Sequence, residues 1–376
     1  MKYIHRPLTQ DAALAAMFPA SSPDLFYLDI ETTGLRADES YLYLIGTACF
    51  ESDENGNGRW MYHAWFGSEM LDEQKILRDF LKFAGGFKKC VSFSGKRFDV
   101  TYLSRCMHQY YLDASSFTDL AFDDYLTLLR PLQNLLYVSR SRLGEWEERI
   151  ERKRADAGCF LSGGEMSALY QNAPRPIPDE VMDALLLHNM CDLQSLVLLK
   201  RLLSFGELTE KPIDFTVERH GSFFALTGSL EKPVPVPVHR FSGDFECRII
   251  GKEVLLTVYE STEDCKLYFP DYRNYVIVQG ENGVMHKDLA ALLPKELCKK
   301  ATPETCYQTV SGRFLPMPLI PISAGKSLSA LEDESSYTIL RRSFIATCGY
   351  IRAQDAYNDL SAYGREFLRR ILQSAE

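Results

Sequence analysis

The sequence predicts an α/β fold in which a mixed sheet is flanked by helices, followed by a β-rich α+β domain. Three segments near the N-terminus have the aromatic and β-branched composition that is typical of strands. Amphipathic segments with helical periodicity follow them along the chain. After about residue 205, short extended segments alternate with turns. Because 376 residues exceed what one core usually serves, we expect two domains, residues 1–205 and 206–376.

The elements of the first domain follow from these patterns in chain order. Strands are expected in apolar, β-branched segments at residues 25–31, 41–50, 60–66 and 90–93. Helices are expected over residues 69–83, from residues 94–99 onward, within 124–154 and over 179–205. Two Asn-Gly pairs within residues 53–58 favour a hairpin, so we expect the first three strands to be antiparallel neighbours. Three strands, a helix, a strand and a helix in this order begin a ribonuclease H-like fold.

The second domain carries no motif with a mechanism, and its role stays open. Strands are expected at residues 234–238, 253–259 and 275–278, a linker at 323–336, and helix over 337–372. One stretch combines basic residues with aromatic ones: Lys266, Tyr268, Phe269, Tyr272, Arg273 and Tyr275. These side chains could form a stacking platform for single strands or belong to the core.

Composition and charge narrow the functional classes. A net charge of −9 argues against a protein that coats nucleic acid non-specifically, but a nuclease can keep its basic residues in one groove. No apolar run reaches the length of a membrane span and no secretory signal pattern is present, so we expect no membrane and a cytoplasmic location. The ten cysteines form no C-x-x-C pair and are expected to be free thiols. Basic residues between 149 and 154 alternate with glutamates and are expected on a solvated helix face.

Two acids end the first expected strand. Asp29 and Glu31 are two residues apart, so both side chains leave the same face of the strand. Adjacent carboxylates repel each other unless a cation lies between them, and hard oxygen ligands suit Mg²⁺ or Mn²⁺. A D-x-E pair alone is also compatible with a solvated strand end.

Two further acids and a histidine complete the candidate set. Asp99 follows a short buried strand in a turn that could direct it toward the first strand, although Asp is also a favoured helix N-cap. His188 and Asp192 lie four residues apart on one face of the long helix and interrupt an apolar stripe. Alone, such a pair is also compatible with an ordinary contact within the helix.

In this order the motifs resemble those of the DEDD exonuclease superfamily. They read D-I-E-T-T-G at residues 29–34, S-G-K-R-F-D at 94–99 and H-N-M-C-D-L at 188–193. The chain is similar to the YprB-like branch of ribonuclease H-like exonucleases, whose D-L-x-x-x-x-R helix corresponds here to residues 124–130, which read D-Y-L-T-L-L-R. The resemblance covers roughly residues 22–205.

Two positions depart from the pattern of that branch. Ser94 stands where the branch usually has Asn, which affects a loop hydrogen bond and no expected metal ligand. His188 precedes Asp192 by four residues, whereas the histidine subgroup of the superfamily places its histidine five before the acid. Four residues before is where the tyrosine subgroup places its tyrosine. The second departure concerns the general base and leaves the four acids unaffected.

The resemblance implies phosphodiester hydrolysis with two ions of Mg²⁺ or Mn²⁺ about 4 Å apart. The implied ligands are Asp29, Glu31, Asp99 and Asp192, and His188 is the implied general base. The implied substrate is the 3′ end of single-stranded DNA or RNA, degraded in the 3′–5′ direction. The residues implied to shape the pocket of the terminal nucleotide are Thr32, Thr33, Gly34 and Leu35. Lys96 and Arg97, the nearest basic residues in sequence, could contact phosphate or be solvated charges at a helix start.

Two other functions fit the same motifs. A catalytically silent nucleic-acid-binding or scaffolding protein could keep the fold, although a binder has no need for clustered carboxylates. A structure-specific endonuclease or a phosphohydrolase could use the same scaffold, because the walls of the groove decide between end and internal cleavage. The sequence does not decide between DNA and RNA, and it leaves protein partners and oligomeric state open.

Overall fold

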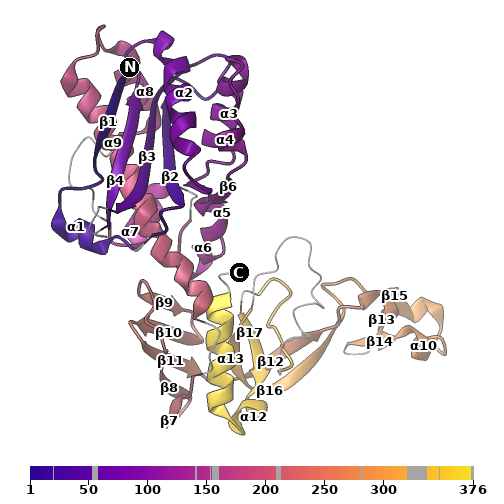
Figure 1. The fold of residues 1–376 in the computed structure, drawn as a ribbon. Helices are drawn as coiled ribbons and strands as arrows, with labels where there is room; N and C mark the ends of the chain where they lie inside the picture. The colour runs from indigo at the N-terminus through magenta and orange to yellow at the C-terminus, as the bar shows by residue number, and fades with distance from the viewer. Residues whose placement is uncertain are drawn as a thin grey trace. The chain divides into compact units, whose positions relative to one another are not determined.

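The computed structural model describes residues 1–19, 21–52, 58–139, 142–152, 154, 161–208, 213–280, 283–319, 337–346 and 348–373. The chain divides into two compact units (Figure 1): Met1–Arg130 with Val138–Leu203, and Pro131–Tyr137 with Ser204–Glu376. The first unit is α/β and the second is rich in antiparallel sheets, as the sequence predicts. Among the described residues, no helix has the length and apolar character needed to cross a membrane.

A six-stranded sheet in the order β1-β4-β3-β2-β5-β6 forms the centre of the first unit. Its strands are β1 Lys2–Pro7, β2 Leu25–Thr32, β3 Leu42–Ser52, β4 Gly58–Phe66, β5 Lys89–Ser92 and β6 Ala121–Asp124. β1, β4, β3 and β2 pair antiparallel, whereas β2, β5 and β6 pair parallel. The parallel pairs bring the C-terminal ends of three strands to one edge of the sheet. The sequence predicts β2 to β5 and misses the edge strands β1 and β6.

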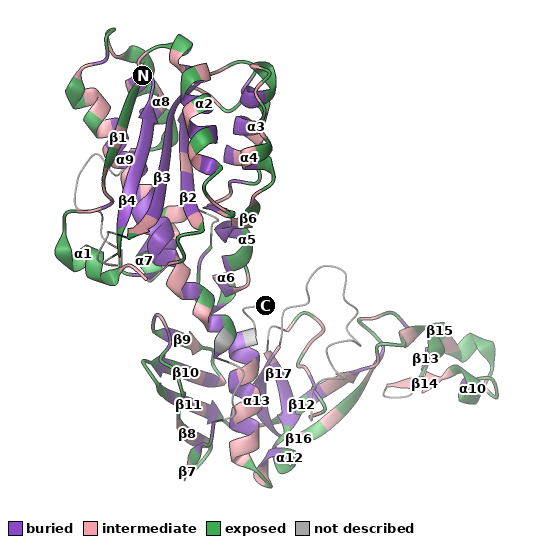
Figure 2. Ribbon diagram, viewed as in Figure 1, coloured by how far each residue is buried: buried purple, intermediate pink, exposed green. Residues whose placement is uncertain are grey.

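Helices cover both faces of this sheet (Figure 1). On one face, α2 Glu73–Ala84 and α3 Asp99–Gln109 pack on apolar side chains that include Phe26, Ile45 and Trp65. On the other face lies α9, Asp179–Leu199, which contacts β2 and β3 as well as α7 and α8. Burial on several sides explains why most of α9 is apolar. Figure 2 shows that β3 and β4, between these helical layers, are buried along most of their length.

The remaining helices of the first unit are short. They are α1 Ala12–Met17, α4 Ser115–Thr118, α5 Tyr125–Leu129, α7 Leu143–Arg149, α8 Gly163–Asn172 and the 3₁₀ segment Met70–Asp72. Another 3₁₀ segment, Lys200–Glu207, continues α9. The predicted helices at residues 69–83 and 179–205 are confirmed, each with one end in a 3₁₀ conformation.

The second unit contains three antiparallel sheets, β7-β8-β11-β10-β9, β12-β16-β17 and β14-β13-β15. The strands are β7 Thr216–His220, β8 Phe223–Ser229, β9 Val238–Phe241, β10 Phe245–Ile250, β11 Glu253–Tyr259, β12 Ser261–Tyr268, β13 Tyr275–Val278, β14 Val284–His286, β15 Cys298–Lys300, β16 Tyr307–Pro318 and β17 Cys348–Arg352. The helices are α6 Leu132–Leu135, α10 Lys287–Ala290, α12 Ala353–Tyr357, α13 Leu360–Gln373 and the 3₁₀ segments Tyr272–Asn274 and Lys295–Leu297. α13 lies between the first two sheets, where its Phe367 packs on Phe245 of β10 and its Tyr363 donates a hydrogen bond to the carbonyl of Pro316 in β16.

The sequence predicts this second unit less completely. The strands at residues 253–259 and 275–278 are confirmed. Residues 234–237 lie outside the strands, because alternate prolines lack the N–H that a ladder requires. Residues 348–352 form β17 where a helix is expected.

The remaining expectations concern a linker, a hairpin turn, the aromatic residues of the second unit and the cysteines. Residues 323–336, expected as a linker, and residues 53–57 of the expected hairpin turn lie outside the described part of the chain. Tyr268 is buried and packs on Tyr307 and Phe344, which places this side chain in the core. Eight of the described cysteines are free thiols, whereas Cys191 is disulfide-bonded, so the expectation of free thiols is wrong at that position.

Candidate active site

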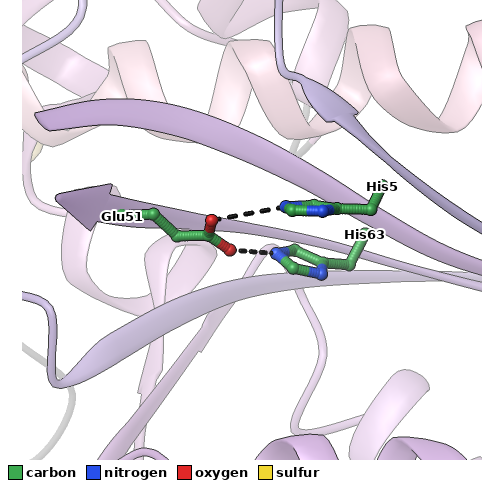
Figure 3. Close-up of side chains that lie close together, drawn as sticks. All are labelled: His5, Glu51 and His63. Atoms are coloured by element: carbon green, nitrogen blue, oxygen red, sulfur yellow. Dashed lines mark hydrogen bonds and ion pairs between the residues drawn. The ribbon is translucent and has the colours of Figure 1, made fainter. Parts of the chain in front are cut away.

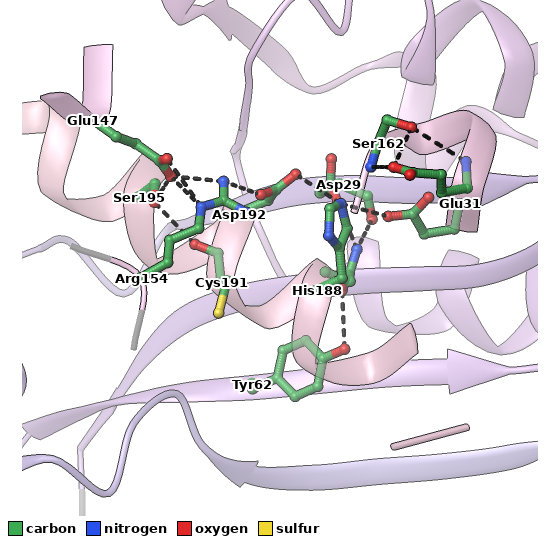
Figure 4. A network of polar contacts seen from close by, with 12 residues as sticks. Asp29, Glu31, Tyr62, Glu147, Arg154, Ser162, His188, Cys191, Asp192 and Ser195 are labelled. Carbon is green, nitrogen blue, oxygen red and sulfur yellow. Dashed lines mark hydrogen bonds and ion pairs between the residues drawn. The ribbon is translucent and has the colours of Figure 1, made fainter. Parts of the chain in front are cut away.

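Four carboxylates from three elements gather around the C-terminal end of β2, and we call them the acid cluster: Asp29, Glu31, Asp99 and Asp192. The first two lie on β2, Asp99 begins α3, and Asp192 lies on α9. Asp99 accepts a backbone hydrogen bond from Ile30, the residue between the two acids of β2. Figure 4 shows Asp192, Asp29 and Glu31 arranged around His188.

Burial raises the pKa of all four acids, and repulsion from other members of the cluster adds to the rise at Asp29 and Glu31. Burial first, and then the charges of Asp192, Glu31 and Asp99, hold the pKa of Asp29 well above its usual range. Burial and the charges of Asp192 and Asp99 do the same to the pKa of Glu31. Burial raises the pKa of Asp99 to about 7. Four acids in one place are therefore costly for the protein unless positive charge accompanies them.

Asn189 of α9 orients Asp29. Its side-chain amide donates to Asp29 Oδ2 at 2.7 Å and to the Asp29 carbonyl at 3.1 Å, while its Oδ1 accepts from the Tyr62 hydroxyl at 2.9 Å. Gly46, which pairs with Asp29 across β2 and β3, leaves room for this amide. A Cβ at Gly46 would lie 1.6 Å from Asn189 Oδ1. The sequence analysis assigns no role to either residue, because their proximity depends on strand register and helix docking.

A buried ion-pair network holds Asp192 (Figure 4). Arg154 Nη2 lies 2.5 Å from Asp192 Oδ1, and its Nε donates to both carboxylate oxygens of Glu147 at 3.0 and 2.9 Å. Ser195 donates a further hydrogen bond to Glu147. Burial raises the pKa of Asp192, and Arg154 opposes that rise.

The position of Arg154 corrects one expectation. The sequence analysis places the basic residues between 149 and 154 on a solvated helix face, but the Arg154 side chain is 10% exposed. Its partners are Glu147 and, from a distant segment, Asp192 of α9. The solvated helix face expected for these basic residues is therefore wrong at Arg154.

His188 faces the same acids. Its Nε2 lies 3.6 Å from Asp192 Oδ2 and 3.9 Å from Glu31 Oε1, too far for good hydrogen bonds and close enough to share a water molecule with them. Its Nδ1 is buried without a hydrogen-bond partner among the described residues. The imidazole thus presents one nitrogen to the acid cluster, as a general base requires.

The loop before α3 delivers Asp99 to the acid cluster. Ser94 has a left-handed backbone with φ of 62°, and its N–H donates to Asp124 Oδ1 at 2.9 Å. Asn adopts this conformation more readily than Ser, which accounts for the Asn that the YprB-like branch carries here. A Cβ at Gly95 would lie 2.9 Å from Asp99 Oδ2, so glycine allows the close approach. Asp124 also accepts from the N–H of Leu126 and thereby caps α5.

A cleft of about 560 Å³ opens in front of the acid cluster. Its described lining comes from β2 and the following loop, from the residue that precedes α3, and from α8 and α9: Asp29, Ile30, Glu31, Thr32, Gly34, Leu35, Phe98, Gly163, Gly164, Ser167, Ala168, Gln171, His188 and Asp192. The Leu35 side chain is 84% exposed. The carbonyl of Thr33 accepts hydrogen bonds from Ser167 and Gln171 at 3.0 and 3.1 Å, which join the loop to α8.

Four expected site residues lie outside this lining: Thr33, Lys96, Arg97 and Asp99. Lys96 and Arg97 are exposed and are not among the described residues that line the cleft. Asp99 is buried behind the cleft, where its carboxylate accepts a hydrogen bond from the backbone of Ile30. The sequence analysis does not find the wall that α8 contributes. A local sequence pattern could have predicted the start of α8. Ser162 and Glu165 form a capping box, and the helix begins with Gly163 and Gly164.

Residues 26–204 match the family model described as the RNase_H superfamily. This match covers a little under half of the chain. No curated protein matches the chain. Similar solved structures include the family B DNA polymerase of Pyrobaculum calidifontis, with 9% identity, a TM-score of 0.38, and 93% of this chain and 46% of the polymerase covered. Another is E. coli exonuclease I in complex with single-stranded DNA, with 10% identity, a TM-score of 0.30, and 55% and 54% covered. The matched region spans about half the length of each of these two proteins.

The donor set of the acid cluster fits hard divalent cations. It offers carboxylate oxygens from four acids, and Arg154 pairs with one oxygen of Asp192. No three of the four acids bring one carboxylate oxygen each to within 4.8 Å of the other two. One other group of described residues does meet this distance.

Proposed function

We propose that this protein is a metal-dependent 3′–5′ exonuclease that hydrolyses phosphodiester bonds of single-stranded DNA or RNA. The observation that carries the proposal is that three acids of the cluster line one cleft together with His188, while Asp99 lies behind it. Mutually repelling carboxylates reduce the stability of a protein that holds no cation, so their clustering favours a site that binds one. The match of residues 26–204 to the RNase_H superfamily model supports a nuclease.

Each residue has a separate task in this proposal. The four acids of the cluster hold Mg²⁺ or Mn²⁺, which when bound supplies positive charge against the phosphodiester and the developing transition state. His188 Nε2 accepts the proton of the attacking water, a task suited to imidazole near neutral pH. Asn189 fixes the orientation of Asp29, and Arg154 fixes that of Asp192.

The cleft walls supply the contacts for the substrate. Thr32, Thr33, Gly34 and Leu35 shape the pocket of the terminal nucleotide, and exposed Leu35 offers apolar surface to a base. The first two residues of α8 are Gly163 and Gly164, which have no side chains. A phosphate can therefore approach the backbone N–H groups of the first turn of this helix. Lys96 and Arg97 contact the phosphates of a longer strand.

Labelled oligonucleotides test the proposal. Single and double strands of DNA and RNA, labelled at the 3′ or 5′ end, are incubated with Mg²⁺ or Mn²⁺ and with a chelator. Release of 3′ mononucleotides that requires the metal is expected, and Asp29→Asn should abolish it. Asp79→Asn is the matched control, because Asp79 pairs with exposed Lys82 on α2.

The product pattern separates the alternatives. Internal fragments from the start of the reaction would indicate a structure-specific endonuclease. Binding of strands without cleavage by either metal would indicate a catalytically silent binder. Cleavage that persists in Asp29→Asn would point to a contaminating nuclease.

A further inference from the structure

We propose that the opposite face of the six-stranded sheet carries a separate transition-metal site that takes Zn²⁺. Its ligands are His5 of β1, Glu51 of β3 and His63 of β4, which we call the histidine cluster (Figure 3). One ligand atom from each of the three residues lies within 4.8 Å of the other two. Two imidazoles and one carboxylate are a ligand set that Zn²⁺ uses with a fourth position open.

Strand register creates the histidine cluster and separates it from the acid cluster. His5 pairs directly with His63 across β1 and β4, and His63 pairs with Thr47 of β3. Because side chains alternate along a strand, Thr47 and Glu51 share the face of His63. Gly46, beside Thr47, pairs with Asp29 and faces α9. The two clusters therefore lie on opposite faces of one sheet and cannot share an ion.

The geometry of the histidine cluster is close to that of a zinc site. The carboxylate of Glu51 places one oxygen 3.3 Å from His5 Nε2 and the other 2.7 Å from His63 Nε2. Ligand atoms in a tetrahedral zinc site are about 3.4 Å apart, as bond lengths of about 2.1 Å require. The imidazole rings are stacked, with centroids 4.4 Å apart and 23° between planes, so a shared ion needs one ring to tilt. His5 is 43% exposed and has room for this movement.

Neighbouring side chains prepare His63 as a ligand. The Tyr3 hydroxyl lies 2.7 Å from His63 Nδ1, so it can accept the Nδ1–H and leave Nε2 for a metal. Cys49 Sγ lies 3.4 Å from His63 Nε2. The two imidazole nitrogens favour Zn²⁺ over Mg²⁺ at this place.

Cobalt serves as a spectroscopic probe of the proposed site. The experiment uses the full chain with Asp29→Asn and Asp192→Asn, so that the acid cluster does not contribute. One equivalent of Co²⁺ should give the visible absorption bands of a low-coordinate site, and Zn²⁺ should displace it. Zn²⁺ should also raise the Tm of this protein, because a ligand that binds the folded state stabilises it.

Substitutions assign the ions to the histidine cluster. His5→Ala should weaken Co²⁺ binding by at least about 100-fold, more than loss of a residue that only supports a ligand. This variant is expected to fold, because His5 is on an exposed part of the edge strand β1, and His63→Gln serves as a second test. His108→Ala, at an exposed histidine of α3, is the matched control and should leave binding unchanged. Absence of Co²⁺ and Zn²⁺ binding, or binding that His5→Ala does not alter, would overturn the proposal.

Discussion

The two faces of the six-stranded sheet carry clusters of different chemistry. The acid cluster, on the face toward α9, offers oxygen donors that come from β2, α3 and α9. The histidine cluster, on the face toward α2, offers donors from three adjacent strands. Adjacent residues of β4 contribute to the two clusters. Tyr62 donates a hydrogen bond to Asn189 on the face toward α9, and His63 contacts Glu51 on the opposite face. Strand alternation thus lets one sheet build two sites, and the donor atoms decide which ion each accepts.

The largest expected effect comes from Asp29→Asn. Losing the charge of one cation ligand costs several kcal/mol of transition-state stabilisation, so cleavage of a 3′-labelled strand should fall roughly 1,000-fold or more. Zn²⁺ binding at the histidine cluster should be unchanged, because it lies on the other face. A variant that retains cleavage, or that loses zinc together with cleavage, would break the separation of the two faces.

The next largest effect concerns Arg154→Met. It leaves buried Glu147 and Asp192 without their cation, and loss of one partner from such a network costs about 3 kcal/mol or more. The free energy of unfolding, measured by urea denaturation in the presence of a chelator, should fall by that amount. Arg78→Met, at an exposed arginine of α2, should leave it unchanged. Equal stability of the two variants would show that Arg154 does not hold the acid cluster together.

Asn189→Ala should act on activity more than on stability. The amide touches Asp29 and no proposed base, so its loss should lower kcat about 10- to 100-fold, as for other residues that orient a metal ligand. Gly46→Ala should reproduce this effect, because the new Cβ would displace the same amide. Unchanged kcat in both variants would indicate that the hydrogen bond from Asn189 is not needed to orient the Asp29 carboxylate.

The smallest effect is the pH dependence of stability without metal. Burial raises the pKa of Asp99 to about 7 and the pKa of Asp29 and Glu31 also lies above the usual range, so the folded protein binds more protons than the unfolded chain between about pH 4 and 7. The free energy of unfolding therefore falls as the pH rises through that window. Asp99→Asn should be more stable than the unsubstituted protein by about 1 kcal/mol or more at pH 8, and by less at pH 4. A stability difference that does not change with pH would contradict this.

Local patterns predict the acid cluster well and its supports poorly. Asp29 and Glu31 follow from strand alternation, and His188 with Asp192 follows from helix spacing, so both pairs are visible in the sequence. Gly46, however, matters only because β3 pairs with β2 in one register and α9 docks on them. Arg154 lies 38 residues from Asp192, and no periodicity connects them.

The same distinction explains which parts of the fold sequence reasoning finds. β2 to β4 are long, apolar and bounded by turn residues, so composition identifies them. β1 is mostly polar and exposed, and it is a strand only because it pairs with β4. The histidine cluster is hidden for this reason, since His5 meets His63 only after β1 joins the sheet. In the second unit, β17 is specified mainly by its pairing with β16.

Manganese binding tests the central claim most directly, because Mn²⁺ suits the oxygen donors of the acid cluster and can be followed by electron paramagnetic resonance. A titration compares the unsubstituted protein with the Asp29→Asn, Asp192→Asn double variant and with His5→Ala. The account predicts that binding is lost in the double variant and kept in His5→Ala. Mn²⁺ binding of equal affinity in the double variant would contradict it.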